Sequence, residues 1–182
     1  DISNFKQIQL AAVMYMDAND SSTPLSNTGG SSGCYGCGAP DSAGRLDKVW
    51  GQLVLPYVKS RIVFRSPMDP NATDVGLAVN EYDVPVPQNH PNISYYNLVR
   101  TDMGYNNVML SPWAYANGIY GSRSVTESQI ARSADTIMFA SSIWDRTATG
   151  QPKGGGNWVI DMPCIYDENG NILEPVVNMR PF

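Results

Sequence analysis

Positive charge is scarce in this sequence and is nowhere concentrated. Lysine and arginine together number 12 of 182 residues, against 17 aspartates and glutamates, so the formal net charge is −5. Binding to the phosphate backbone of a nucleic acid needs a clustered basic face that displaces counterions. The composition therefore argues against a nucleic-acid partner, and the acidity mainly favours solubility.

The sequence also lacks a long apolar run. A membrane-spanning helix needs about 20 predominantly apolar residues, and no such stretch occurs. No signal peptide is visible either, because Asp1 to Asn4 lead directly into an amphipathic segment. A chain that starts within a helical pattern and without methionine is typical of a processed or trimmed product. We therefore expect that a membrane anchor preceding Asp1 is missing.

Histidine is nearly absent, which limits the catalytic chemistry. His90 is the single histidine, and it lies in a polar loop bounded by proline, where we expect a solvated side chain. Ser-His or Cys-His catalysis would depend on this one residue. Nucleophile-elbow, P-loop and dinucleotide-binding motifs are missing as well. A carboxylate pair remains open because acidic residues are plentiful, but no feature favours one. We predict no catalytic residues and a protein that is not an enzyme.

The three cysteines are Cys34, Cys37 and Cys164, and the first two form a CxxC pattern in a Gly/Ser-rich loop. A redox-active CxxC normally opens a helix, which the surrounding glycines disfavour. A zinc site would need two further ligands, and only Cys164 and His90 remain. We favour a local disulfide between Cys34 and Cys37 over metal binding and redox catalysis. A disulfide implies an oxidising compartment outside the cytoplasm.

The start of the chain predicts a helix over Ser3–Asp17, with Ser3 or Asn4 as its N-cap and turn-forming residues after it. One apolar face recurs at three- and four-residue steps and consists of Phe5, Ile8, Ala12 and Tyr15 or Met16. The other sides carry Leu10, Ala11, Val13 and Met14. Because the helix is apolar nearly all round in its second half, it must be covered on more than one side.

The remaining pattern alternates short elements with long loops. We predict a second helix at 46–55, a strand or extended piece at 60–66, proline-punctuated loops with brief strands at 67–91, a helical turn at 126–131, strands at 136–140 and 157–161, and a hairpin at 164–173 around Asn169-Gly170. Gly154 to Gly156 suggest a flexible turn. The expected fold class is α+β, an N-terminal helix on a small antiparallel sheet with long loops.

We divide this single predicted domain, residues 1–182, into the helix (1–20), a connecting region with the second helix and loops (21–125), and the strands and hairpin (126–182).

Calcium is the cofactor that the composition best suits. Oxygen ligands gather at Asp17–Asp20 and at Asp167–Asn171, although the second segment lacks the glycine position of an EF-hand loop. The hairpin turn already explains that second segment. Ten tyrosines and four tryptophans could form a carbohydrate-binding face, but aromatic residues serve cores and interfaces more often. The residues assign no cofactor, and a secreted module for carbohydrate or calcium is the alternative function.

Six segments, in order, resemble one family, the bacterial type IV pilin-like proteins related to the major pseudopilin of type II secretion. They are SNFKQIQLA with MYMD (3–17), LPYVKS (55–60), FRSPMDP (64–70), MGYN (103–106), ESQIARSADTIMFA (127–140) and GGNWVIDMPC (155–164). Ser66 and Ser141 depart from the pattern, since the family often has cysteine and aspartate there. The closing DGH-type segment and the preceding membrane helix are not in this chain.

The resemblance implies a pilin-like head and a structural role. Such proteins are made with an N-terminal hydrophobic helix, are cut by a prepilin peptidase, and polymerise through helix packing with their heads outward. The implied partners are copies of the same chain, other pilins and the assembly or secretion machinery, with the membrane reached only through the missing helix. The implied location is an extracellular filament, the cell surface or the periplasm, with an inner-membrane anchor before assembly. Subunit packing would fall to Phe5, Ile8, Leu10, Val13 and Met14.

Overall fold

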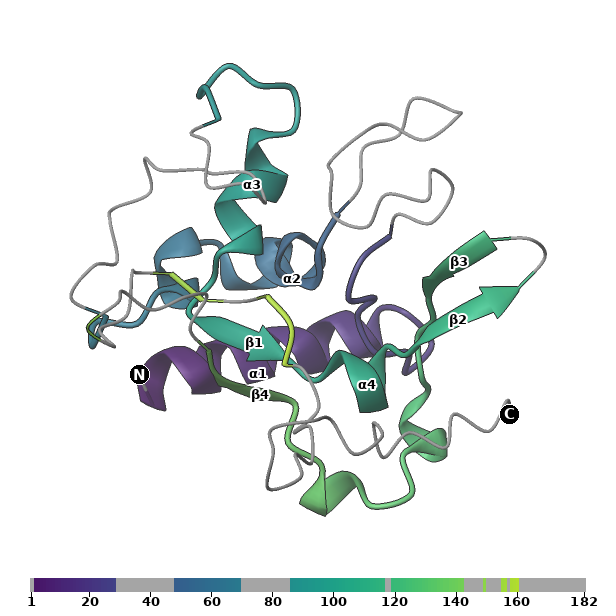
Figure 1. The fold of residues 1–182 in the computed structure, drawn as a ribbon. Helices are drawn as coiled ribbons and strands as arrows, with labels where there is room; N and C mark the ends of the chain where they lie inside the picture. The colour runs from purple at the N-terminus through teal and green to yellow at the C-terminus, as the bar shows by residue number, and fades with distance from the viewer. Residues whose placement is uncertain are drawn as a thin grey trace.

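The computed structural model describes residues 2–28, 48–69, 86–116, 119–142, 149, 155–156 and 158–160. The predicted Cys34–Cys37 disulfide and the predicted hairpin at 164–173, with the calcium segment in it, lie outside these residues. The elements are α1 (Ile2–Asp17), α2 (Trp50–Val58), the 3-10 helix η1 (Arg61–Phe64), α3 (Ile93–Val99), β1 (Met103–Tyr105), α4 (Asn107–Leu110), β2 (Trp113–Ala116), β3 (Ile119–Ser122), the 3-10 helices η2 (Glu127–Gln129) and η3 (Ser133–Asp135), and β4 (Phe139–Ser141) (Figure 1).

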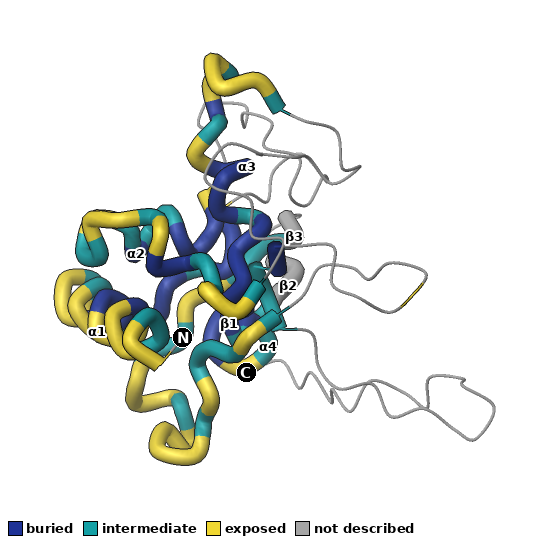
Figure 2. The backbone as a smooth tube through the Cα atoms, turned by 90° about the vertical axis from the view of Figure 1, so that its left-hand side faces the viewer, coloured by how far each residue is buried: buried dark blue, intermediate teal, exposed yellow. Residues whose placement is uncertain are grey.

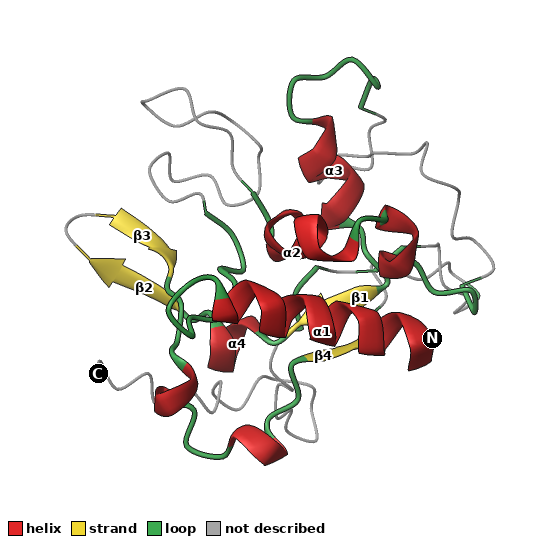
Figure 3. Cartoon of the chain, turned by 180° about the vertical axis from the view of Figure 1, so that it is seen from behind, coloured by secondary structure: helices red, strands yellow, loops and turns green. Residues whose placement is uncertain are grey.

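The fold is α+β, as predicted. Strand β1 pairs antiparallel with β4, with Gly104 opposite Ala140, and β2 pairs antiparallel with β3 as a separate hairpin. Residues 158–160, within the predicted strand at 157–161, form a parallel bridge to β1 in which Tyr105 pairs with Val159. Seen from behind, α1 crosses the β1–β4 pair and runs beside α2 (Figure 3).

Helix α1 starts at Ile2, so the predicted capping role of Ser3 or Asn4 is wrong. Both residues lie inside the first turn, and the Asn4 side-chain amide instead donates to the carbonyl oxygen of Arg65 over 2.9 Å. The predicted end at Asp17 is confirmed. Beyond it, Asp20 and its neighbour adopt left-handed backbone angles that stop the helix.

The second helix is confirmed, but it lies later in the chain than the predicted 46–55. It runs from Trp50 to Val58 and retains Pro56 inside its last turn. Val49 precedes it in extended conformation, and its backbone N–H donates to the Gln52 side chain over 3.0 Å. The helix ends at Lys59, whose φ of 66° places it in the left-handed region.

The strand or extended piece predicted at 60–66 is wrong at its centre, because Arg61–Phe64 form the 3-10 helix η1, and only Ser60 and Arg65 on either side are extended. A strand would place Ile62 and Phe64 on one face, since its side chains alternate with a period of two. Instead Ile62 is 64% exposed, whereas the adjacent residues Val63 and Phe64 are both buried. Two consecutive core residues suit a tight helical turn better than a half-buried strand.

The helical turn predicted at 126–131 is confirmed as η2. Its capping box is formed, with the Thr126 backbone N–H donating to the Gln129 side chain over 2.9 Å. The strand predicted at 136–140 is confirmed only at its end, since β4 begins at Phe139. Residue Thr136 instead terminates η3, where its hydroxyl donates to the Arg132 carbonyl oxygen.

Aromatic rings from four elements meet at the centre of the core. Trp50 is fully buried, and its ring centroid lies 5.5 Å from Phe64, 5.7 Å from Tyr105 and 4.9 Å from Phe139. Its indole N–H donates to the carbonyl oxygen of Trp158. In Figure 2 the buried segments accordingly lie on one side of α1 and include β1 and α3. The Trp50 side chain therefore joins α2, η1, the two strands of the β1–β4 sheet and the segment at 158–160.

The first prediction concerns this core. Replacing Trp50 with alanine removes the ring contacts and leaves a cavity, so we expect the free energy of unfolding to fall by about 3–5 kcal/mol. Denaturant unfolding of the wild type and the variant measures this change. The control Ile137→Ala removes a side chain that is 65% exposed, and it should change stability by less than about 0.5 kcal/mol. A loss near zero for Trp50→Ala would contradict the account.

Candidate functional site

Helix α1 has an inner face that belongs to the core. The buried residues of the helix are Ile8, Ala11, Ala12 and Met16. Their spacing of one, three or four residues places them along one side of the cylinder. The helix packs there against α2 and η1, and the ring of Tyr15 contacts that of Tyr57 edge-on at 6.3 Å. The inner face fixes α1 to the rest of the chain.

The opposite side of α1 is exposed and carries four apolar side chains among polar ones. We call it the outer face, and it consists of Ile2, Leu10, Val13 and Met14, with exposed fractions of 74%, 61%, 44% and 44%. The remaining exposed residues of the helix are Ser3, Lys6, Gln7, Gln9 and Asp17. Figure 2 shows this exposed side turned away from the buried segments.

Charge does not explain why the outer face is exposed. The helix carries one cation, Lys6, and one anion, Asp17, and neither its first turn nor its last turn holds a charge that complements the helix dipole. Grouped apolar side chains on a surface often mark a site of interaction with another protein. The outer face is therefore the candidate interaction site of the described chain.

The structure separates the five residues predicted to pack between subunits. Ile8 is fully buried and Phe5 is partly buried against the core, so both hold α1 to its own head. Leu10, Val13 and Met14 remain exposed and belong to the outer face. The sequence pattern alone did not divide the five residues in this way, because the packing of α2 and η1 decides which side of the helix is exposed.

The predicted solvated histidine is partly buried instead. The Nδ1 atom of His90 accepts a hydrogen bond from the Asn92 backbone N–H over 3.1 Å, and its ring contacts Tyr96 edge-on at 5.2 Å. These contacts shape the turn that enters α3.

The first predicted calcium segment follows α1. Its Asn19 side-chain amide donates to the Tyr15 carbonyl oxygen over 2.7 Å, whereas Asp20 lines an open hollow together with Glu127. Within the described ranges, no group of three or more acidic, histidine or cysteine side chains is arranged to hold a metal ion. The second predicted segment, at 167–171, lies outside those ranges. Calcium binding stays part of the alternative function.

A buried acid joins three segments close to the core. The Asp102 side chain is only 4% exposed, and its Oδ2 atom accepts from the Ser66 backbone N–H over 2.6 Å. Its Oδ1 atom has no hydrogen-bond donor in the described chain and lies 3.9 Å from the Arg65 guanidinium. Burial raises the pKa of the Asp102 carboxyl, and the neighbouring Asp69 raises it further, against the lowering effects of Ser66 and Arg65.

The glycine segment next to this acid is closely packed. The Gly155 backbone N–H donates to Asp69 over 2.7 Å, and its φ of 68° suits glycine. A Cβ atom on Gly156 would lie 2.2 Å from the Thr101 carbonyl oxygen, so no larger residue fits there. These two residues are buried, which corrects the prediction of a flexible turn for this part of the segment.

Comparison with known proteins identifies no relative. No family model, no curated protein and no solved structure matches the chain. Among the described residues, no helix has both the length and the apolar character needed to cross a membrane.

The two faces of α1 can be distinguished by their stability effects. Ile8→Ala removes a fully buried side chain, and we expect it to lower the free energy of unfolding by about 2–5 kcal/mol. Leu10→Ala truncates an exposed side chain and should change it by less than about 0.5 kcal/mol. Chemical denaturation of both variants measures the difference. Equal losses would contradict the assignment of inner and outer faces.

The raised pKa of Asp102 has a consequence for stability. At a pH below the pKa that the Asp102 carboxyl has in the unfolded chain, the group is neutral in both the folded and the unfolded state. As the pH rises through the higher pKa of the folded state, the carboxyl becomes charged while buried, and the free energy of unfolding falls. We therefore expect Asp102→Asn to be more stable than the wild type at pH 7, with an advantage that shrinks toward pH 3. Thermal unfolding across this pH range measures it. Asp135→Asn, at an exposed ion pair, is the control, and an Asp102→Asn advantage that grew on acidification would contradict the prediction.

Proposed function

We propose that this chain is the head of a structural subunit in a bacterial type IV pilus-like filament, located outside the cell or in the periplasm. The observation that carries the proposal is the outer face of α1. Ile8 fixes the inner face of helix α1 in the core, while Leu10, Val13 and Met14 on the outer face are exposed to solvent. A helix of this kind has a stable position and an uncovered side.

Covering this side with further copies suits the chemistry of the helix. Burial of apolar surface stabilises an association by about 25 cal/mol per Å². Lys6 and Asp17, the two charged residues of α1, are exposed on the same side, and their charged ends would have to remain at the rim of such a contact. A contact between different surfaces of identical subunits, repeated without closure, generates a helical filament. Helix packing through α1 would be such a contact.

The family resemblance supports the same function. Its segments include α1, the end of α2, the last residue of η1 with the loop after it, β1, and the stretch from η2 to β4. Several of them meet around Trp50, through Phe64, Tyr105 and Phe139. We propose the partners and processing that the resemblance implies: other pilin-like subunits, the assembly or secretion machinery, and a membrane anchor in a helix preceding this chain.

The alternative, a secreted module for carbohydrate or calcium, is less well supported. Sugar binding by stacking requires aromatic rings at the surface. Among the described aromatic side chains, Trp50, Tyr95 and Tyr105 are fully buried and serve the core. For calcium, the acidic hollow beside Asp20 and Glu127 contains two carboxylates, fewer than typical calcium sites employ.

The filament proposal predicts a separation of assembly from stability. In the full gene product expressed in its host, the double variant Leu10→Glu/Val13→Glu should lower filament yield at least tenfold, which corresponds to about 1.4 kcal/mol per contact. The charges would have to be buried at the subunit contact without partners. Sheared surface fractions examined by electron microscopy and quantified by immunoblot measure the yield.

The matched control is Ile137→Glu, which places the same charge at an exposed apolar residue outside α1. It should assemble like the wild type, and the isolated heads of all variants should unfold within about 0.5 kcal/mol of one another. Wild-type yield from the double variant, or equal losses in the double variant and the control, would refute the role of the outer face.

A further inference from the structure

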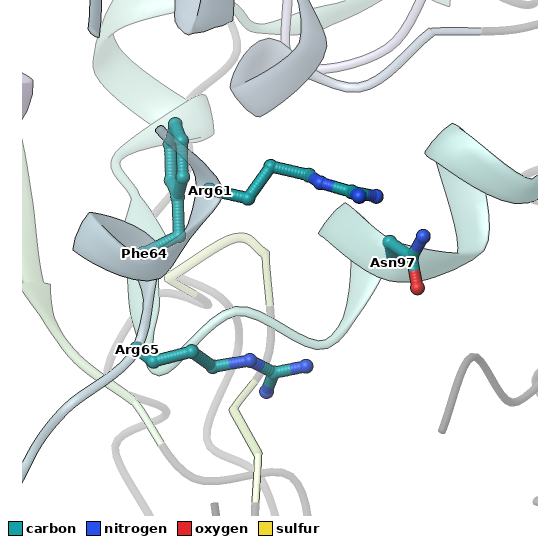
Figure 4. A pocket seen from close by; sticks show the side chains of 4 residues that line it. All are labelled: Arg61, Phe64, Arg65 and Asn97. Atoms are coloured by element: carbon teal, nitrogen blue, oxygen red, sulfur yellow. The ribbon is translucent and has the colours of Figure 1, made fainter. Parts of the chain in front are cut away.

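A small pocket lies between η1 and α3, and it shares no residue with the outer face of α1. Its lining consists of Arg61, Phe64, Arg65 and Asn97. In Figure 4 the side chains of Arg61, the first residue of η1, and Arg65, which follows η1, extend in the same direction. Both extend toward Asn97 of α3. Phe64 is buried, so it contributes an apolar wall rather than exposed surface.

The local structure explains why these side chains converge. Residues three apart lie above one another in a 3-10 helix, so Arg61 and Phe64 share one side of η1. Arg65 follows directly in extended conformation. Across the pocket, Asn97 lies in the middle of α3 between buried neighbours, which holds its amide in place.

The pocket carries more positive charge than its surroundings neutralise. Arg65 donates one hydrogen bond to the Arg100 carbonyl oxygen over 2.6 Å, and its guanidinium lies 3.9 Å from Asp102. Within the described chain, Arg61 has no ion pair or hydrogen bond through its guanidinium. Two guanidinium groups at one pocket repel each other, and an anion between them would relieve that repulsion.

Asn97 provides an additional polar group at the pocket. The residue is 9% exposed, and its side-chain amide is not among the buried polar atoms of the described chain that lack a hydrogen-bond partner. An amide N–H beside a free guanidinium is a donor set for an oxygen acceptor.

We propose that this pocket binds a carboxylate group, with Arg61 as its main ligand and Asn97 and Arg65 as additional donors. The planar fork of a guanidinium matches the two oxygens of a carboxylate. The pocket has room for about one water-sized group, so one carboxylate oxygen enters while the rest of the ligand stays outside. One free guanidinium also balances the single charge of a carboxylate better than the double charge of a phosphate.

The carboxylate has two sources with the same chemistry: a small organic acid in solution, or an acidic side chain of a second copy of this chain, whose sequence has 17 of them. The test uses sodium acetate as the probe, followed by NMR titration at constant ionic strength. We expect saturable binding to the wild type and at least tenfold weaker binding to Arg61→Gln. Arg123→Gln, which removes the same charge at an exposed residue outside the pocket, should bind like the wild type.

Sulfate and self-association complete the test. Sulfate should bind more weakly than acetate, and Asn97→Asp should weaken acetate binding because it adds a negative charge beside the ligand. Sedimentation distinguishes the sources: dimers or oligomers that acetate and Arg61→Gln both dissociate indicate a second copy, whereas saturation of a monomer indicates a free acid.

Three results would overturn the carboxylate assignment: no saturable acetate binding, equal losses in Arg61→Gln and Arg123→Gln, or tighter binding of sulfate than of acetate. None of them bears on Leu10 or Val13, so the filament proposal stands or falls separately.

Discussion

The fully buried indole of Trp50 joins parts of the chain that are far apart in sequence. It contacts Phe64 of η1, Tyr105 of β1 and Phe139 of β4, and it donates to the Trp158 carbonyl oxygen. Sheets as small as the β1–β4 pair are marginally stable alone, because each strand has only three residues. Packing around one large ring compensates for this. Helix α2, which carries Trp50, also provides the surface on which α1 rests.

This packing has consequences at two surfaces. Because α2 and η1 occupy the inner side of α1, around Ile8, the apolar residues on its other side have no described cover. Because Phe64 turns into the core, the tight turn of η1 directs Arg61 toward α3. The candidate interaction face and the proposed carboxylate pocket thus both follow from the way η1 and the two helices close over the core.

The sequence predicted the elements whose structure depends on interactions between residues close together in the chain. The apolar periodicity of α1 and the capping box between Thr126 and Gln129 were both sufficient, and both are confirmed. Helix α3 was not predicted, since its seven residues are too few for a periodic signal and consist largely of residues with modest helix propensity. Tertiary burial decides its structure, as it decides that of η1. The pocket was missed for a related reason: Arg61 and Asn97 meet only after η1 and α3 have packed.

The account depends most on the claim that the outer face of α1 is covered in the assembled state. Two native methionines test it without substitution, because Met14 lies on the outer face and Met68 is 78% exposed elsewhere. Exposed methionine is readily oxidised to the sulfoxide. Oxidative footprinting with mass spectrometry should show Met14 reacting in the isolated head and protected in the filament, while Met68 reacts in both. Equal oxidation of Met14 in head and filament would contradict helix packing through this face.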